Sequence, residues 1–340
     1  MAISISYSPA AGGSVSIPLG KILNIRIVRK YHDPLSELYV KCILDTPPTS
    51  VPVAMTLTID SASESFPVKS YIYENRVMTL AGQGLAHRIV DAGVLPDEKY
   101  AFTGANLTSQ YISPYYPYGS EFPSAPALSI FGWYGNISAW NVIDAYCRQR
   151  FERVPRINAQ NQVSVYTLNN TAHIALGNQT IGTKAISVKE QTFSVADDSK
   201  GVIRKIYVDQ SDDPAGPDFS YSETNPYNIG NNVQKVLYWT PPDAYVLIRN
   251  AAARTMIYQS TLAKTQVKLK YPVFYGARTG DVVKFSDSRY ESGSLKYMYI
   301  GEYEAEFENG QWSTSFQLWD TKYLLPWASA ELSGKGIPTS

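Results

Sequence analysis

The chain has few of the residues on which metal sites and disulfide frameworks depend. It holds two cysteines, Cys42 and Cys147, and three histidines in 340 residues. Two thiols so far apart, one in a strand pattern and one in a helix pattern, do not form the clusters typical of structural zinc or of disulfide-rich secreted domains. We therefore expect both to be buried free thiols in a protein made in a reducing compartment.

Targeting and membrane signals are missing as well. The N-terminus, Met1 to Tyr7, has no basic region followed by an apolar one, so no secretory leader is predicted. No uninterrupted apolar run approaches the ~18–20 residues that span a bilayer, so no membrane insertion is expected. Neither sign of charge is in excess. Lys+Arg and Asp+Glu number 30 each, which argues against a general nucleic-acid binder.

Catalytic motifs are the third absence. The sequence has no GxSxG, HExxH, P-loop or CxxC pattern. His32, His87 and His173 each stand alone, which is more typical of surface or hydrogen-bonded histidines than of ligands or bases. The segment Gly82–Gly84 lacks the third glycine of a dinucleotide site, and the loop Asp209–Asp218 lacks the glycine and the glutamate of a calcium loop. We predict no catalytic residue, no metal site and no cofactor.

The sequence does have tyrosines and strand patterns. Tyrosine is enriched in strands and at interfaces, and a β-rich fold accounts for most of the 26 tyrosines. Apolar and polar residues alternate at 23–27, 38–44, 53–59 and 68–80, with turn residues between these segments. Short strands at this spacing predict a small barrel or sandwich that ends near residue 95. The first 20 residues are rich in Gly, Ser and Pro and are predicted to form an extended arm or loop.

The most regular pattern lies near the end of the chain. Glutamates alternate with Tyr303, Ala305 and Phe307, then Asn309-Gly310 follows, and apolar and polar residues alternate again to Trp319. Asn-Gly suits a type I′ turn because both central residues need a positive φ, so we predict an antiparallel hairpin with one face in a core. Facing carboxylates can form a glycosidase pair, but a solvated or lumen-facing edge is the simpler interpretation of Glu302, Glu304, Glu306 and Glu308.

These patterns divide the chain into four predicted parts. A first β-domain covers residues 1–95, an α+β middle domain 96–208, a helix with a second β-domain 209–328, and a flexible tail 329–340. The middle domain contains a long Tyr/Pro-rich loop at Tyr111–Tyr118 and a helix that begins after the N-cap Ser138. A polar surface excursion at Asp209–Asn232 and a helix from about Pro242 to Ala263 precede the last strands. The two β-domains show no clean sequence repeat.

Several motifs follow one another along nearly the whole chain in the order of a known family. They are the N-terminal strands Met55–Ile59 and Leu80–Gln83, the tryptophan-bearing helix Ser138–Arg148, the strand Gln162–Tyr166, the long helix Ala244–Ala263, the step Gly280-Asp281-Val282-Val283 and the turn Asn309-Gly310-Gln311-Trp312-Ser313-Thr314. In this order they resemble the baseplate hub proteins of contractile-tailed phages and related injection machines, the late-control or tail protein D and P family. The Asp209–Asn232 excursion and the Tyr/Pro-rich loop have no match in the family pattern.

The resemblance implies a mainly β fold in which two tail-tube-like β-barrel domains are joined by a mixed α/β region. It implies a homotrimer whose pseudo-sixfold ring adapts the hexameric tail tube to the trimeric spike and lets DNA pass through the lumen. The expected partners are the spike, the tail tube or its initiator, other baseplate proteins and the tape measure protein. The expected location is the virion's tail baseplate, assembled in the host bacterial cytoplasm. The family has no catalytic residue to carry over, and no binding residue is assigned.

Two other interpretations stay open at this point. A β-rich receptor- or carbohydrate-binding tail module would use the segment Tyr111–Tyr118, because aromatic faces stack on sugars. An enzyme would need an unmarked carboxylate site within Glu302–Glu308.

Overall fold

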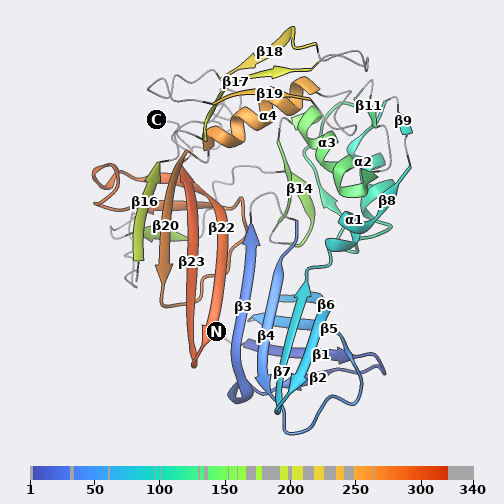
Figure 1. Cartoon of the computed structure of the whole chain (residues 1–340), viewed down its shortest axis with the longest axis vertical. Coiled ribbons are helices and arrows are strands. Elements are labelled where there is room, and N and C mark those ends of the chain that lie inside the picture. The colour runs from blue at the N-terminus through green and yellow to red at the C-terminus, as the bar shows by residue number, and fades with distance from the viewer. Residues whose placement is uncertain are drawn as a thin grey trace.

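The fold is mainly β, with helices in the middle of the chain and beside one small sheet (Figure 1). The computed structural model describes residues 3–30, 34–59, 62–95, 97–99, 101–128, 131–133, 137–151, 153–158, 160–165, 174–177, 192–197, 201–209, 218–225, 235–240, 249–262 and 264–320. The predicted class, mainly β with an α+β middle region, is confirmed.

One sheet of 13 described strands runs through the molecule. Its main path, in order across the sheet, is β16 (Thr192–Asp197), β20 (Thr265–Tyr271), β23 (Gln311–Asp320), β22 (Lys296–Glu308), β3 (Ile22–Lys30), β4 (Glu37–Ile43), β7 (Val77–Gln83), β6 (Ala62–Glu74), β5 (Pro52–Ile59), β1 (Ile3–Pro9) and β2 (Val15–Ile17). Off this path, β21 (Val282–Ser286) pairs with β22, and β15 (Ala175–Gly177) pairs with β21. Figure 1 shows the strands from β16 to β7 side by side as one curved layer.

The C-terminal hairpin forms as its sequence predicts. Asn309 and Gly310 have φ of 50° and 78°, as a type I′ turn requires. The alternation places Tyr303 and Ala305 of β22 and Phe316 of β23 in the core. The four glutamates point to the opposite face because side chains alternate along a strand.

The first and last β-rich parts of the chain meet where β22 pairs with β3. The pairing is antiparallel, with Ala305 opposite Ile27 and Phe307 opposite Ile25. One hydrophobic cluster extends from Ile5 in β1 to Leu318 in β23 across this pair. The two predicted β-domains therefore share one continuous sheet and one core, while their limits at residues 95 and 209 stay predictions.

Within this sheet, one strand order occurs twice. The first part has β3-β4-β7-β6-β5 and the last part has β16-β20-β23-β22-β21, and every neighbouring pair in both is antiparallel. The fourth strand of each set, β6 or β22, has 13 residues and a register shift against the fifth strand of its set, at Val68/Ser70 or Ile300/Glu302. The topology is thus duplicated although the two sequences show no repeat.

The predicted N-terminal arm is instead part of the sheet, so that prediction was wrong. β1 pairs with β5 and with β2, and Ile5 and Tyr7 are buried. The alternation of Ile3, Ile5 and Tyr7 with serines gives β1 one apolar face, and the glycines lie in the turn that follows. The composition of the whole segment obscured this short period-2 pattern.

The middle region packs around helix α3 (Ala139–Phe151), whose predicted N-cap is confirmed, since the Asn141 N–H donates to Ser138 Oγ at 3.2 Å. Tyr146 on this helix lies among aromatic rings, with Phe131 and Phe102 at centroid distances of 5.5 and 5.8 Å. The region's other elements are α1 (His87–Asp91), β8 (Gly93–Val94), β9 (Asp97–Lys99), α2 (Gly104–Leu107), η2 (Thr108–Ile112), β10 (Ser120–Glu121), β11 (Phe131–Trp133), β12 (Ile137–Ser138), β13 (Pro155–Ile157) and β14 (Val163–Val165).

The Tyr/Pro-rich segment is not the long loop that its composition predicts. A capping box between Thr103 and Asn106 begins α2, and the π-helical turn η2 continues it to Ile112. Leu107, Tyr111 and Ile112 lie close in helical spacing and are buried together. The prolines that exclude a strand come only after this turn, so they do not prevent the helix.

A three-stranded sheet of β17 (Ile203–Val208), β18 (Tyr221–Thr224) and β19 (Lys235–Trp239) packs on helix α4 (Arg249–Leu262). α4 is the described part of the predicted helix, whose first residues lie outside the described chain. The Asp209–Asn232 excursion is more than surface loop, because its described part contains β18, which pairs with β17. The predicted strand Ile181–Val188 and the tail 329–340 lie outside the described residues.

Candidate functional site

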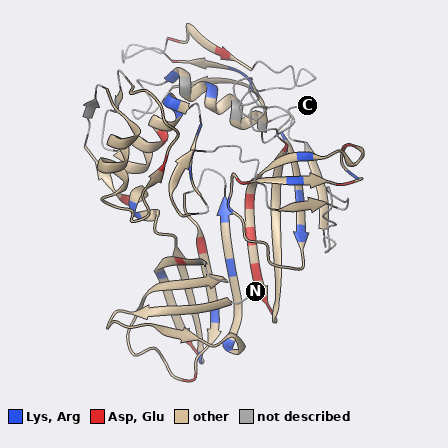
Figure 2. Cartoon of the chain, turned by 180° about the vertical axis from the view of Figure 1, so that it is seen from behind, with Lys and Arg blue, Asp and Glu red and all other residues tan. Residues whose placement is uncertain are grey.

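The side of the sheet opposite the core forms a polar face where the two β-rich parts meet. We define this polar face by its charged and amide side chains on four strands, which are Asn24, Arg26 and Lys30 of β3, Glu302, Glu304, Glu306 and Glu308 of β22, Gln317 of β23, and Lys268 and Lys270 of β20. Figure 2 shows the acidic strand β22 between the basic residues of β3 and those of β20.

Neighbouring strands supply partners to the glutamates of the polar face. Arg26 donates from Nε to Glu304 Oε1 at 2.7 Å, and Asn24 donates from Nδ2 to Glu306 Oε1 at 3.1 Å. The hydrogen bond from Glu304 raises the pKa of Arg26 further above its usual value. Glu302 stands opposite Lys30 in the register. This arrangement is cross-strand charge pairing and gives no carboxylate the isolation that a general acid needs.

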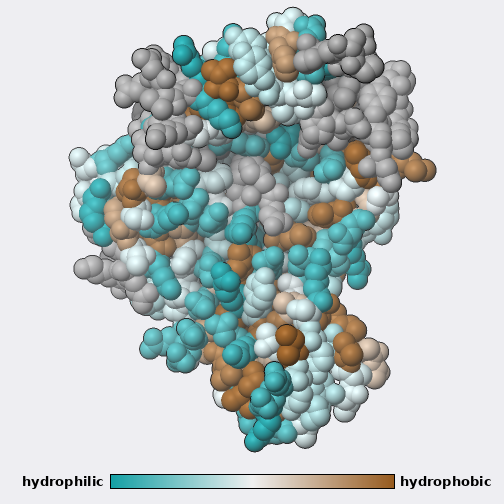
Figure 3. All heavy atoms as spheres, viewed as in Figure 1, coloured by the Kyte–Doolittle hydropathy of each residue, from teal (hydrophilic) through white to brown (hydrophobic). Residues whose placement is uncertain are grey.

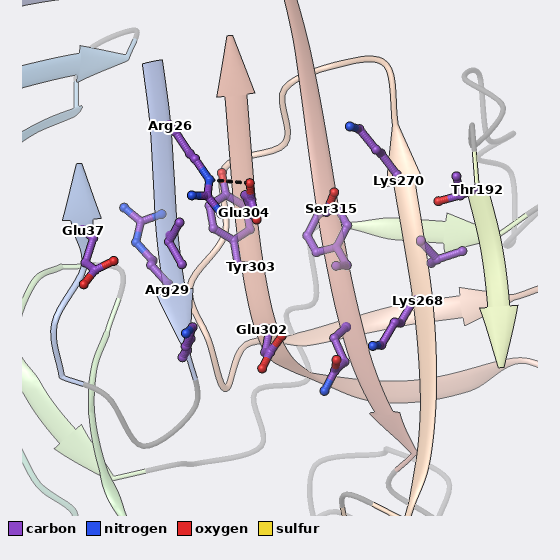
Figure 4. A pocket seen from close by; sticks show the side chains of 15 residues that line it. Arg26, Arg29, Glu37, Thr192, Lys268, Lys270, Glu302, Tyr303, Glu304 and Ser315 are labelled. Atoms are coloured by element: carbon purple, nitrogen blue, oxygen red, sulfur yellow. Dashed lines mark hydrogen bonds and ion pairs between the residues drawn. The ribbon is translucent and has the colours of Figure 1, made fainter. Parts of the chain in front are cut away.

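A shallow hollow of about 440 Å³ lies over this face. Residues of β3, β4, β16, β20, β22 and β23 line it, so it spans the junction of the two β-rich parts. In Figure 4, Lys268 and Lys270 stand across the hollow from Arg26 and Glu37, with Glu302 and Glu304 between them. The lining carries both signs of charge, which suits a wall that a polyanion passes better than a site that binds one tightly.

A buried ion cluster of Arg29, Glu64 and Arg278 lies beneath the same junction. Arg278 holds Glu64 with two hydrogen bonds, of 3.0 Å from NH1 and 2.9 Å from NH2, and Arg29 NH2 donates to the same carboxylate at 2.7 Å. Arg29 also donates to the carbonyl of Ala277 at 3.1 Å and lies 5.2 Å from the centroid of the Tyr303 ring. The two guanidinium groups and the carboxylate have side chains 11% and 18% exposed, respectively.

The charges in this cluster depend on one another. Burial alone raises the pKa of Glu64, but the positive charges of Arg278 and Arg29 outweigh it and hold the pKa at about 2. Burial lowers the pKa of Arg29, and the neighbouring charge of Arg278 adds to that shift. Burial also raises the pKa of Tyr303 to about 12, so its hydroxyl stays protonated and donates to the Tyr275 carbonyl at 2.8 Å.

This cluster ties the middle region to the sheet. Arg278 donates to the side-chain oxygen of Asn161, which lies in the turn between β13 and β14. The hydroxyl of Tyr116, from the Tyr/Pro-rich segment, donates to the Asn161 carbonyl. A second ion pair joins Arg156 of β13 to Asp281 at 2.8 Å. The three parts of the chain are therefore held in fixed positions relative to one another.

Sequence reasoning missed this cluster, although a signal was present. Arg29 falls on the core side of β3, two and four residues after the buried Ile27 and Ile25, and Glu64 falls on the side of Phe66 in β6. A charged residue at a core-facing strand position requires a buried partner. The sequence does not reveal that partner, because Arg278 is more than 200 residues away.

The isolated candidates from the sequence do not form a site. His87 begins helix α1, with Nδ1 3.1 Å from the Gly84 carbonyl, whereas His32 and His173 lie outside the described residues. Gly82 is a strand residue in close contact with its neighbours, since a Cβ there would lie 2.7 Å from Met55 Cε. Burial raises the pKa of the Cys42 thiol to about 11 and that of Cys147 well above its usual value.

The predicted loop at Asp209 and the aromatic segment are structural where the chain is described. Asp209 is buried, and its carboxylate accepts from the Asp218 N–H at 2.9 Å. Tyr111 and Tyr116 are 8% and 4% exposed, so their rings belong to the core and are not free to stack on a sugar. Among the described residues, no group of three His, Cys, Asp or Glu side chains is placed to hold a metal ion. None of the helices in the described ranges is long and apolar enough to cross a bilayer.

Comparison with known proteins identifies the fold but not the family. No family model matches the sequence, and no curated protein matches it. Among solved structures, the chain is similar to a tail protein from Neisseria meningitidis, with a TM-score of 0.69 and 13% identity over 96% of this chain and 99% of that one. It is also similar to the 43 kDa tail protein of prophage MuSo2 from Shewanella oneidensis, with a TM-score of 0.66 and 10% identity over 93% and 98% of the two chains.

A third similar structure comes from a secretion machine. It is the E. coli c3393 protein, described as a type VI secretion component with structural similarity to the T4 phage tail proteins gp27 and gp5. Its TM-score is 0.54 at 8% identity, over 88% of this chain and 73% of that one. At such low identities the similarity shows the fold alone. The chain has the fold of phage tail proteins and of related secretion-machine components.

Proposed function

We propose that this chain is a structural subunit of a phage-type tail, the baseplate hub, and that it acts through its surfaces and not as an enzyme. The fold supports this proposal, since the similar structures include tail proteins matched over nearly their whole length. The duplicated strand order, two sets in one chain laid edge to edge, is the observation that carries it.

The duplication suits an adaptor between symmetries. Three chains, each with two sets of strands, form a ring of six similar sets, which matches a sixfold tube on one side and a threefold spike on the other. In such a homotrimer the polar face forms the lumen wall. Its paired charges let DNA pass without the strong attraction that an excess of Lys and Arg would create. The spike, the tail tube or its initiator, other baseplate proteins and the tape measure protein are the proposed partners in the virion.

The carbohydrate-binding alternative has lost the observation that favoured it. It depended on Tyr111–Tyr118 as an exposed aromatic loop, and both Tyr111 and Tyr116 lie in the core. The enzymatic alternative depended on free carboxylates on β22, where Glu304 is bound by Arg26. Neither is proposed further.

The mass and symmetry of the purified chain test the proposal. We expect light scattering at micromolar concentration to give three times the mass of one chain, and electron-microscope class averages to show a threefold ring with an open centre. A chain that stays monomeric, even in the presence of its cognate spike, refutes the hub proposal.

A further inference from the structure

Two strand edges of the sheet have no partner among the described strands. β16 ends the path of the sheet and pairs only with β20. β6 pairs with β5 through residues 62–67 and with β7 through residues 68–74, so its second half has no described strand on the side away from β7. Free edges of this kind present unpaired backbone N–H and C=O groups and serve as templates for another strand.

The duplicated topology indicates which strand fits each edge. In the last set of strands, the second half of β22 lies between β23 and β3, and β3 is the first strand of the other set. The equivalent of β22 is β6, and the equivalent of β3 is β16. Applied once more, the junction seen within the chain places a β16 beside the second half of a β6. The two edges of one chain are at opposite ends of its two sets, so the second strand must come from another copy.

We propose that β16 of one protomer pairs antiparallel with the second half of β6 of the next protomer, which continues the sheet from copy to copy. This pairing rests on the proposed ring and names the interface that closes it. The partner is therefore a second copy of this chain, bound head to tail, with each copy using one edge of each kind.

The register of the interface follows from the register within the chain. When β6 and β22 are aligned on their shifts, Ile72 is equivalent to Glu304 and Tyr73 to Ala305. Aligned through β4 and β20, Val195 is equivalent to Ile27 and Ala196 to Val28. Glu304 stands opposite Val28, and Ala305 opposite Ile27. The interface therefore sets Ile72 opposite Ala196, and Tyr73 opposite Val195.

The exposure of these side chains agrees with the pairing. Ile27 and Ala305 are 1% and 0% exposed at the junction within the chain, whereas the equivalent Val195 is 44% exposed on its open edge. Ile72 is 60% exposed on the other open edge. Figure 3 shows apolar surface exposed over the first β-rich part, in the lower half of the molecule. Pairing the two edges removes Ile72 and Val195 from water, and their burial favours association.

Disulfide trapping tests this register directly. Residues opposite each other on antiparallel strands have Cα atoms about 4.5–5.5 Å apart, within the range of a disulfide. The double variant Ile72→Cys/Ala196→Cys should therefore form disulfides between copies. Cys42 and Cys147 are both 0% exposed and do not compete. Under mild oxidation, we expect most of the monomer band on a non-reducing gel to shift to dimer and trimer bands that collapse on reduction.

Two matched variants control the experiment. Val28→Cys/Glu304→Cys places thiols at the equivalent pair inside one chain, so it should form a disulfide without any increase in mass and shows that the geometry suffices. Val53→Cys/Ala196→Cys carries one thiol at an equally exposed position, 49% exposed on β5, and should stay monomeric on the gel.

The outcomes separate the interface from the proposed function. A trimer in solution in which Ile72→Cys/Ala196→Cys cross-links no more than the Val53→Cys control refutes the strand pairing and leaves the hub proposal standing. A monomer that gives no cross-link, with or without the spike, refutes both.

Discussion

Neutralising Glu64 tests whether the buried ion cluster holds the three parts of the molecule together. The substitution Glu64→Gln keeps the shape of the side chain and removes the charge that Arg29 and Arg278 share. The pKa of Glu64 lies at about 2, against an ordinary value of 4.5. A shift of about 2.5 pH units, at 1.36 kcal/mol for each, makes the ionised carboxylate worth about 3.4 kcal/mol of folding free energy at pH 7.

The sign of the shift gives the pH dependence. Because folding depresses this pKa, the stabilisation is fully present above pH 4.5 and is lost as the pH falls toward 2. The difference in unfolding free energy between the wild type and Glu64→Gln should thus fall from about 3.4 kcal/mol at pH 7 to about 1.4 kcal/mol at pH 3. Equilibrium urea denaturation, followed by tryptophan fluorescence across this range, measures the difference.

Glu304→Gln is the matched control. Glu304 also accepts from an arginine, but both side chains of that pair are more than a third exposed, at 36% and 46%. Exposed ion pairs contribute about 0–1 kcal/mol, so this variant should stay close to the wild type at all pH values. A Glu64→Gln variant that loses less than about 1 kcal/mol at pH 7, or whose loss does not change with pH, contradicts the role assigned to the cluster.

Three further predictions concern the interface, the hairpin and the thiols. Ile72→Lys places a charge in the proposed interface and should weaken the trimer roughly tenfold or more in sedimentation equilibrium, whereas Val53→Lys should leave it intact. Gly310→Val forces a β-branched residue to the φ of 78° found at the turn and should cost about 1–2 kcal/mol in chemical denaturation, and an unchanged midpoint counts against the type I′ turn. Cys42 and Cys147 should not react with Ellman's reagent at pH 8 until the chain unfolds, because both are buried with raised pKa, and fast reaction of the folded protein contradicts their burial.

Local patterns predicted the elements that depend on local interactions. The hairpin of β22 and β23 follows from strict alternation and the Asn309-Gly310 turn, and α3 follows from its cap at Ser138. The patterns failed where composition hid a short element, as in β1 and η2. They also failed at Leu23, which is 37% exposed because the register of β3 shifts between Ile22 and Asn24.

The candidate site depends on contacts that no local pattern contains. β3 pairs with β22 although Glu304 and Val28 are 276 positions apart, and Glu64 meets Arg278 across 214 positions. The alternation shows that each strand has a polar face. It does not show which strands lie side by side, and so it cannot place the basic residues of β3 next to the glutamates of β22. The resemblance to hub proteins supplied the order of domains but assigned no residue to the lumen or to an interface.

The chemistry of the two equivalent junctions differs in a way that fits their roles. Inside the chain, β3 and β22 are tethered by the folding of one polypeptide, and their polar side is charged, with Arg26 bound to Glu304. At the proposed junction between copies, the position of Glu304 holds Ile72 and the position of Arg26 holds Ser194. Association of separate chains costs translational and rotational freedom, so it requires apolar area removed from water, which ion pairs in solvent do not provide. The charges also prevent the wrong match, because a β22 edge paired with β16 would leave Glu304 without its arginine. The same strand order can thus be joined once by folding and once by assembly, with the side chains at two positions deciding which.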